Sequence, residues 1–239
     1  MSAVDPRLAA AVEASRRWYD AVAELHDLPV RVDDRLWVAL AEPPPWHSAV
    51  KTLRADVDAA AALGVWGDRT GGSVADSFGV LDLAGRGFDL LIDATWVYHP
   101  GVTAPWPEPW RVVREPDLLT RWCHRHDYAG VLPPAVLDRA DLHVLARIVD
   151  DEPVAGAVVH DAGGAAGMSN LWSVSGVPTE ADVTDVLACA GVLLPGRAVT
   201  DYAWDEELAA VLAAGFEPVG PHRVWRTSTP PRRPEPRPR

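Results

Sequence analysis

One stretch near the C-terminus decides the fold: residues 202–225 have the sequence YAWDEELAAVLAAGFEPVGPHRVW. The apolar residues of its first half recur at helical spacing and are Leu208, Val211 and Leu212. Gly215 suits the left-handed turn that follows a helix. From 216 to 225 the pattern is extended. The stretch therefore predicts a short helix that ends at a glycine and leads into a terminal strand.

The pattern of strands and helices extends back from this stretch to residue 110. The predicted strands are 110–115, 142–149, 153–160, 167–174, 198–203 and 217–226. The predicted helices are 116–127, 134–139, 179–190 and 205–214, with Thr179 as an N-cap. Large aromatic residues on the apolar faces of these elements should be buried, namely Trp110, Trp122, Trp172, Phe216 and Trp225.

This order, β-α-α-β-β-β-α-β-α-β, together with the AGFEPVG sequence at 214–220, resembles the GCN5-related N-acetyltransferase (GNAT) superfamily. The resemblance covers 110–226 and implies an α/β fold, a mixed twisted sheet with helices on both faces. It also implies acyl transfer from acetyl-CoA to an amine. An unrelated α/β domain with the same alternation is the alternative interpretation.

The first half predicts a second, smaller set of elements. A helix is expected at 6–26, a strand at 36–40, a helix at 48–63, and a hairpin formed by 78–83 and 88–98. The segment 101–109 is rich in proline and is expected to connect the halves. The domains would be an N-terminal α/β half at 1–105, a GNAT-like domain at 108–227 and a disordered tail at 228–239. The first half is interpreted either as a truncated GNAT-like repeat or as an unrelated extension.

The GNAT resemblance implies a glycine-rich turn after the fourth strand, whose amides hold the CoA pyrophosphate. The corresponding residues would be Leu171, Trp172, Ser173, Val174, Ser175 and Gly176. The turn departs from the family pattern, because it has one glycine, a proline at 178, and carboxylates at Glu180 and Asp182 that would repel phosphate. Weak or absent acetyl-CoA binding is therefore predicted.

The residues expected to move protons also depart from the family. Its usual Asn and Tyr positions hold Trp204 and Val211, neither of which can do that work. Tyr202 and Asp201, on the preceding strand, are the candidate catalytic residues. Asp201 could also be an exposed carboxylate at a strand edge.

A second polar site is predicted in the first half, at Asp93, Thr95 and His99. These residues lie on a strand with apolar residues on both faces, which is typical of a central strand. A structural ion pair of Asp93 is the favoured explanation. No metal site is predicted: Cys123, His126 and Asp127 share a helix face, but no second ligand cluster accompanies them.

The composition excludes several classes of protein. The formal net charge of −12 argues against nucleic-acid binding. No apolar run has the length of a membrane span, and two distant cysteines do not suggest a disulfide framework, so a cytoplasmic protein is expected. Two functions are open: an acyltransferase whose small-molecule or protein amine acceptor is unknown, and a non-catalytic GNAT-like scaffold that binds a small ligand or a partner protein. The sequence does not indicate an oligomeric state.

Overall fold

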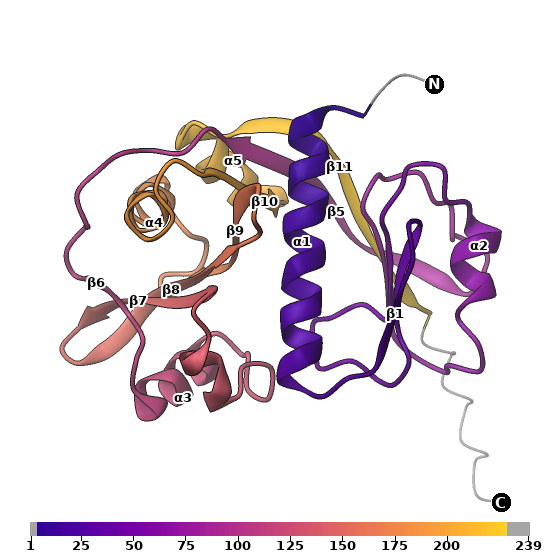
Figure 1. Ribbon diagram of the computed structural model, residues 1–239, viewed down its shortest axis with the longest axis horizontal. Coiled ribbons are helices and arrows are strands. Elements are labelled where there is room, and N and C mark those ends of the chain that lie inside the picture. Colours follow the sequence, from indigo (N-terminus) through magenta and orange to yellow (C-terminus); the bar gives the residue numbers. More distant parts are fainter. Residues whose placement is uncertain (1–3, 229–239) are drawn as a thin grey trace, which may run out of the picture.

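The computed structural model describes residues 4–228 and contains one mixed sheet of 11 strands (Figure 1). The strands are β1 (Val30–Val32), β2 (Leu36–Ala39), β3 (Val50–Thr52), β4 (Ser73–Asp76), β5 (Phe88–His99), β6 (Trp110–Val112), β7 (Leu142–Val149), β8 (Glu152–Asp161), β9 (Ala165–Ser173), β10 (Ala198–Ala203) and β11 (Glu217–Thr227). The helices are α1 (Pro6–Leu25), α2 (Ala59–Gly64), α3 (Pro116–Arg125), the 3-10 helix η1 (Pro134–Asp138), α4 (Glu180–Leu193) and α5 (Asp205–Ala213).

The second half has the predicted elements in the predicted order, with small differences at their ends. Its strands belong to one sheet, and helices cover both faces of it. The side chains of α1 and α3 pack on one face, whereas those of α4 and α5 pack on the other. The five predicted aromatic residues are all buried, which confirms the apolar faces assigned to these elements.

The first half differs from the prediction in two places. Residues 48–63 are not one helix, because 50–52 form β3 and only 59–64 are helical. Asp58 caps that short helix by accepting the Ala61 N–H at 2.8 Å. The alanines and valines at 50–61 suit a helix by periodicity, but residues 50–52 are fully buried between β2 and β4, where a strand satisfies their backbone.

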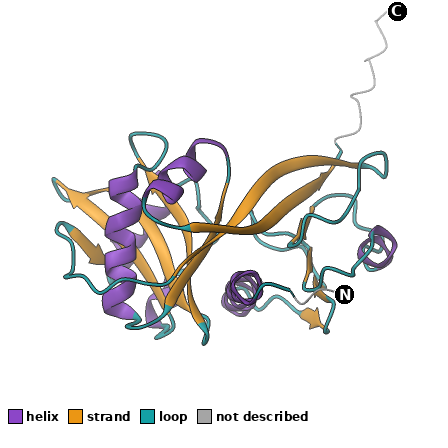
Figure 2. Cartoon of the chain, turned by 90° about the horizontal axis from the view of Figure 1, so that it is seen from above, coloured by secondary structure: helices purple, strands orange, loops and turns teal. Residues whose placement is uncertain are grey.

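The predicted hairpin is also wrong. Residues 78–83 form no strand, and β5 instead lies between β10 and β11, antiparallel to both. The strand β11 from the C-terminus in turn lies between β5 and β4. Each half therefore contributes one long strand to the sheet beside the other half, and the two strands run between the halves in Figure 2.

Outward from its centre, the strand order has the same pattern of pairing on both sides, apart from the extra edge strand β6. It is β1-β2-β3-β4-β11-β5-β10-β9-β8-β7-β6. Outward from the central β11–β5 pair, each side has an antiparallel step, a parallel pair and two antiparallel steps, and β6 adds one more antiparallel step beyond β7. The parallel pairs are β3/β4 and β9/β10, and each is joined through a helix.

This pattern changes the basis of the predicted repeat. The predicted match of a strand, a helix and a hairpin to the start of the second half was wrong. Only the last residues of the predicted helix at 48–63 are helical, and the predicted hairpin does not form. The observed match is of β1–β4 with β7–β10. A repeat remains a prediction, now with support from strand pairing. The connector 101–109 has no helix or strand, and the predicted disordered tail lies outside the described residues from 229 onward.

Candidate functional site

The parallel strands β9 and β10 separate after a short paired segment. Hydrogen-bonded pairing joins 165–167 to 198–200 and ends at the pair Gly167–Thr200. Asn170 has a φ of 54°, and the register with β8 shifts beside it, between Gly156 and Val158. This bulge turns the second part of β9 away from β10. The facing edges of the two strands are thereby left open.

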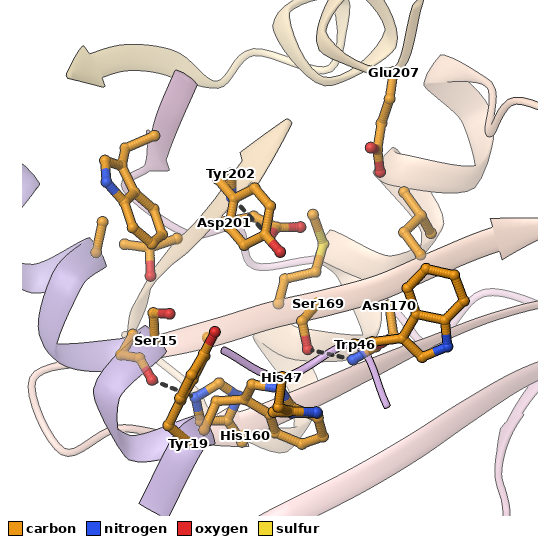
Figure 3. A pocket seen from close by; sticks show the side chains of 18 of the residues that line it. Ser15, Tyr19, Trp46, His47, His160, Ser169, Asn170, Asp201, Tyr202 and Glu207 are labelled. Atoms are coloured by element: carbon orange, nitrogen blue, oxygen red, sulfur yellow. Dashed lines mark hydrogen bonds between the residues drawn. The ribbon is translucent and has the colours of Figure 1, made fainter. Parts of the chain in front are cut away.

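A cavity of about 380 Å³ opens at this separation, on the side of the sheet covered by α1 (Figure 3). Its walls come from α1, the loop before β3, the end of α3, strands β5, β8, β9 and β10, and the start of α5. They are unusually aromatic, with Trp18, Tyr19, Trp46, Trp96, Tyr128, Tyr202 and Trp204. The acidic lining residues are Asp127, Asp201 and Glu207.

Both candidate catalytic residues line this cavity. Asp201 is 9% exposed, so it is not the exposed strand-edge carboxylate of the alternative interpretation. Its Oδ1 accepts the Tyr202 N–H at 2.7 Å. Burial, together with the nearby charge of Glu207, raises the pKa of Asp201 well above its ordinary value. Burial likewise raises the pKa of Tyr202, which keeps its phenolic proton at neutral pH.

Glu207 was missed by the sequence analysis. Its side chain extends from the first turn of α5 into the cavity (Figure 3), and burial raises its pKa to about 7. Its neighbours Asp205 and Glu206 are exposed. The signal was available in the helical spacing, because Glu207 lies four residues before Val211, which is buried.

The histidines of the cavity were also missed. His47, His126 and His160 come from three distant segments, and burial lowers the pKa of each, to about 4 for His47. His160 Nε2 is 2.9 Å from the Ala14 carbonyl oxygen and fixes α1 to the sheet. No local pattern could have brought these residues together.

The residues predicted to bind the cofactor occupy two environments. Leu171 lines the cavity, whereas Trp172 is buried and stacks on His126 with their ring centroids 5.9 Å apart. In the turn that follows, the Ser173 and Ser175 hydroxyls are 2.8 Å apart, and the Val174 N–H donates to the Val154 carbonyl. Gly176 has a φ of 104°.

Asp182 does not face this turn as the sequence analysis expected. It is 1% exposed, accepts the Thr179 N–H at 2.9 Å in a capping box, and pairs with Arg147 at 2.7 Å. Its charge is therefore compensated inside the protein. Among the described residues, no partner is found for the backbone N–H groups of 180 and 181, in the first turn of the helix, or of 177, two residues before its N-cap. Of the two carboxylates in this turn, Glu180 and Asp182, only that of Glu180 is exposed.

The residues of the second predicted polar site, Asp93, Thr95 and His99, do not line the cavity. Asp93 is exposed and its carboxylate lies 3.1 Å from Arg223, which is the structural ion pair that the sequence analysis favoured. His99 accepts the Gly101 N–H and packs on Phe216. The strand is central, but its contributions to the cavity are Ile92 and Trp96.

Residues 4–228 have neither a cluster of metal ligands nor a helix suited to a membrane. Within that range there is no group of three or more His, Cys, Asp or Glu side chains that could hold a metal ion. No helix of the same residues combines the length and apolar character needed to cross a bilayer.

Comparison with solved structures identifies the fold. A GCN5-related N-acetyltransferase from Kribbella flavida aligns over 92% of this chain and 96% of its own, with a TM-score of 0.60 and 13% identity. A functionally unknown conserved protein from Staphylococcus epidermidis aligns over 85% and 95%, with a TM-score of 0.60 and 13% identity. A GNAT-family protein from Novosphingobium aromaticivorans aligns over 93% and 97%, with a TM-score of 0.52 and 12% identity.

The chain therefore has the GNAT fold, and the similarity includes the first half as well as the second. No protein-family model matches the sequence, and no curated protein is similar to it. The fold is established by structure alone, and the chemistry has to be argued from the site.

Proposed function

We propose that the protein is an acyl-CoA-dependent N-acyltransferase whose reaction takes place where β9 and β10 separate. One observation carries the proposal: the open strand edges lead directly into a cavity that contains Asp201 and Tyr202. A donor group bound along the edges and an acceptor in the cavity would meet at this point. The GNAT-fold neighbours supply the class of donor.

The chain has groups that could hold acetyl-CoA, which supplies an acetyl group activated as a thioester. The unpaired edge of β9 beyond Gly167 offers backbone N–H and C=O groups to an extended amide chain. The free amides of 180 and 181 at the start of α4, and that of 177 in the turn before it, are suited to phosphate, and the dipole of that helix favours an anion. Glu180 opposes this binding, while Asp182 is neutralised by Arg147.

The two buried side chains divide the proton transfers. Asp201, once ionised, accepts a proton from the ammonium form of the acceptor and leaves a nucleophilic amine. Tyr202 keeps its proton because burial raises its pKa, so it is the proposed general acid. The two side chains come from adjacent residues, and the bond from the Tyr202 N–H to Asp201 Oδ1 fixes the carboxylate.

Acetyl-CoA titration followed by calorimetry and thermal unfolding tests the proposal. We expect binding that raises the melting temperature, since a ligand of the folded state stabilises it. Glu180→Gln should strengthen binding roughly threefold, the effect of removing one exposed like charge. Glu206→Gln, an equally exposed change away from the turn, is the matched control. Asp182→Gly is unsuitable, because it would break the capping box and the Arg147 pair.

The alternative is a non-catalytic scaffold that uses the same cavity for a ligand. The turn at 174–182 favours this alternative, because it has a single glycine and a proline where the fold places phosphate. If acetyl-CoA shifts the melting temperature of neither the natural protein nor Glu180→Gln, the transferase proposal is wrong and the scaffold replaces it.

A further inference from the structure

We infer that the cavity between α1 and β10 binds a small primary amine carried on a flat apolar or aromatic body, held as its ammonium ion. This inference rests on the proposed function in naming the acceptor, but the binding site that it describes needs no acyl donor. The charge of the lining, its aromatic walls and its closure by Trp46 support it independently.

The charge of the lining has one sign. Its acidic lining residues are Asp127, Asp201 and Glu207, and none of its lining residues is Lys or Arg. The histidines add no positive charge near pH 7, because burial lowers the pKa of each of the three. An anionic ligand would find no counter-charge among the lining residues, whereas a cation would stabilise the ionised forms of Asp201 and Glu207, whose pKa values burial raises.

The walls are aromatic on several sides of those carboxyl groups. Tyr202 packs on Trp96 with centroids 5.4 Å apart, and Trp204 stacks on Tyr202 at 6.0 Å with an interplanar angle of 23°. Tyr19 and His47 form another wall, with centroids 5.4 Å apart. Aromatic faces attract a cation and also pack against a flat apolar group, so the same walls suit both parts of such an amine.

The entrance is partly covered by Trp46. Its side chain is 70% exposed, and its backbone has a φ of 67°, which is costly for a bulky residue. The indole N–H donates to the Asp127 carbonyl at 3.1 Å, which joins the loop before β3 to the end of α3 beside the cavity. A cavity of about 380 Å³ under this cover is of the size that accepts small molecules.

The test measures binding to the full chain without acetyl-CoA, by calorimetry and tryptophan fluorescence. The probes are 2-phenylethylamine, its uncharged analogue 2-phenylethanol, the anion 3-phenylpropanoate and the ring-free butylamine. We expect 2-phenylethylamine to bind at least tenfold more tightly than any of the other three. Equal affinity for the alcohol, or tighter binding of the anion, would overturn the inference, and so would a failure of 2-phenylethylamine to bind.

Two variants locate the charge contact. Glu207→Gln should weaken 2-phenylethylamine binding about tenfold, while Glu206→Gln, the adjacent exposed residue, should leave it unchanged. Equal effects of the two variants would also overturn the inference. Both substitutions lie in the first turn of α5, so circular dichroism and the melting temperature are measured to verify that each variant is folded.

The inference and the proposed function fail in different ways. Amine binding without any response to acetyl-CoA would keep the amine site and remove the transferase. Acetyl-CoA binding with no preference for 2-phenylethylamine would keep the transferase and remove the small aromatic amine as its acceptor. In that case, acetylation of a lysine-containing peptide by the protein would identify a protein acceptor.

Discussion

The two parallel strand pairs, β9/β10 and β3/β4, have matching positions in the sheet, but a cavity lies beside the first pair and buried side chains fill the space beside the second. In β9/β10 the last paired residues are Gly167 and Thr200, followed by Asp201 at the cavity. In β3/β4 they are Lys51 and Ala75, followed by Asp76. The side chains at and just beyond this last pair are fully buried, namely Lys51, Thr52, Asp76 and Ser77. Thr52 Oγ1 accepts the Ser77 N–H at 2.8 Å and so joins the two strands.

The difference shows how one strand arrangement yields either a site or a core. Gly167 on β9 has no side chain, and the His160 ring packs against it. The lysine in the corresponding place on β3 is itself fully buried. The Lys51 Nζ lies 5.1 Å from the Tyr19 ring centroid and 5.2 Å from that of Trp96. Asp76 is likewise used internally, because its carboxylate accepts the Phe78 and Leu81 N–H groups.

The largest expected effect separates the two aspartates. Asp201→Asn should lower kcat/KM for acetyl transfer by about 10²–10⁴, the usual cost of losing a general base, with little change in melting temperature. Asp76→Asn should leave kcat/KM of the folded protein close to natural and lower the melting temperature instead, because its carboxylate organises a turn. Steady-state kinetics and thermal unfolding of both variants provide the comparison. If the two variants lose activity and stability alike, the functional difference between the strand pairs is wrong.

The next effect concerns Gly167, the last residue of β9 that pairs with β10. A Cβ on Gly167 would lie 2.0 Å from His160 Cε1, and that ring is held by the Ala14 carbonyl. Gly167→Ala should therefore cost about 2–3 kcal/mol of unfolding free energy, measured in urea. Gly164→Ala is the matched control, since nothing lies within 4 Å of its Cβ position and its φ is not positive. An equal loss in both variants would show that crowding at His160 is not the cause.

Much of the second half could be predicted from the sequence because its signals are local. Periodicity located α4 and α5, and Thr179 marked the start of α4 through a capping box that the structure contains. The first half could not be predicted as well, since its pairing is not local. Residues 88–99 pair with strands more than a hundred residues away, so no turn signal at 84–87 could reveal their true neighbours.

Of the cavity residues discussed above, the sequence indicated mainly those on strand β10. Asp201 and Tyr202 followed from the resemblance and now line the cavity, although their catalytic role remains a proposal. The side chains of Trp46, His47 and His160 approach through tertiary packing that no spacing encodes. Asp182 misled the sequence analysis for a related reason, because its partner Arg147 is distant in the chain.

A smaller effect is expected at the lysine that closes β3/β4. Burial lowers the pKa of Lys51 to about 7, and no hydrogen-bond partner of its Nζ is found within residues 4–228. Since the unfolded chain protonates this lysine with a pKa near 10.5, the folded state loses stability as pH falls from there to 7. Lys51→Met should raise stability by about 2 kcal/mol at pH 7 and by much less at pH 10. Thermal unfolding at both values measures this, and destabilisation at pH 7 would show that the contacts with Tyr19 and Trp96 outweigh burial.

The smallest effect is expected at Glu207 of α5, which lines the cavity beside β9/β10. The stability that it contributes depends on pH in the opposite direction to that of Lys51. The pKa of Glu207 is raised from 4.5 to about 7, so between these values the folded state holds a proton that the unfolded chain has lost. Stability from this group is therefore lost as pH rises from 4.5 to 7, the reverse of Lys51. Glu207→Gln should raise the melting temperature at pH 8 and have no such effect at pH 4.5. The same measurement on Glu206→Gln should show neither change. A melting-temperature gain at pH 8 that the two variants share would assign the effect to the net charge of the protein rather than to the cavity.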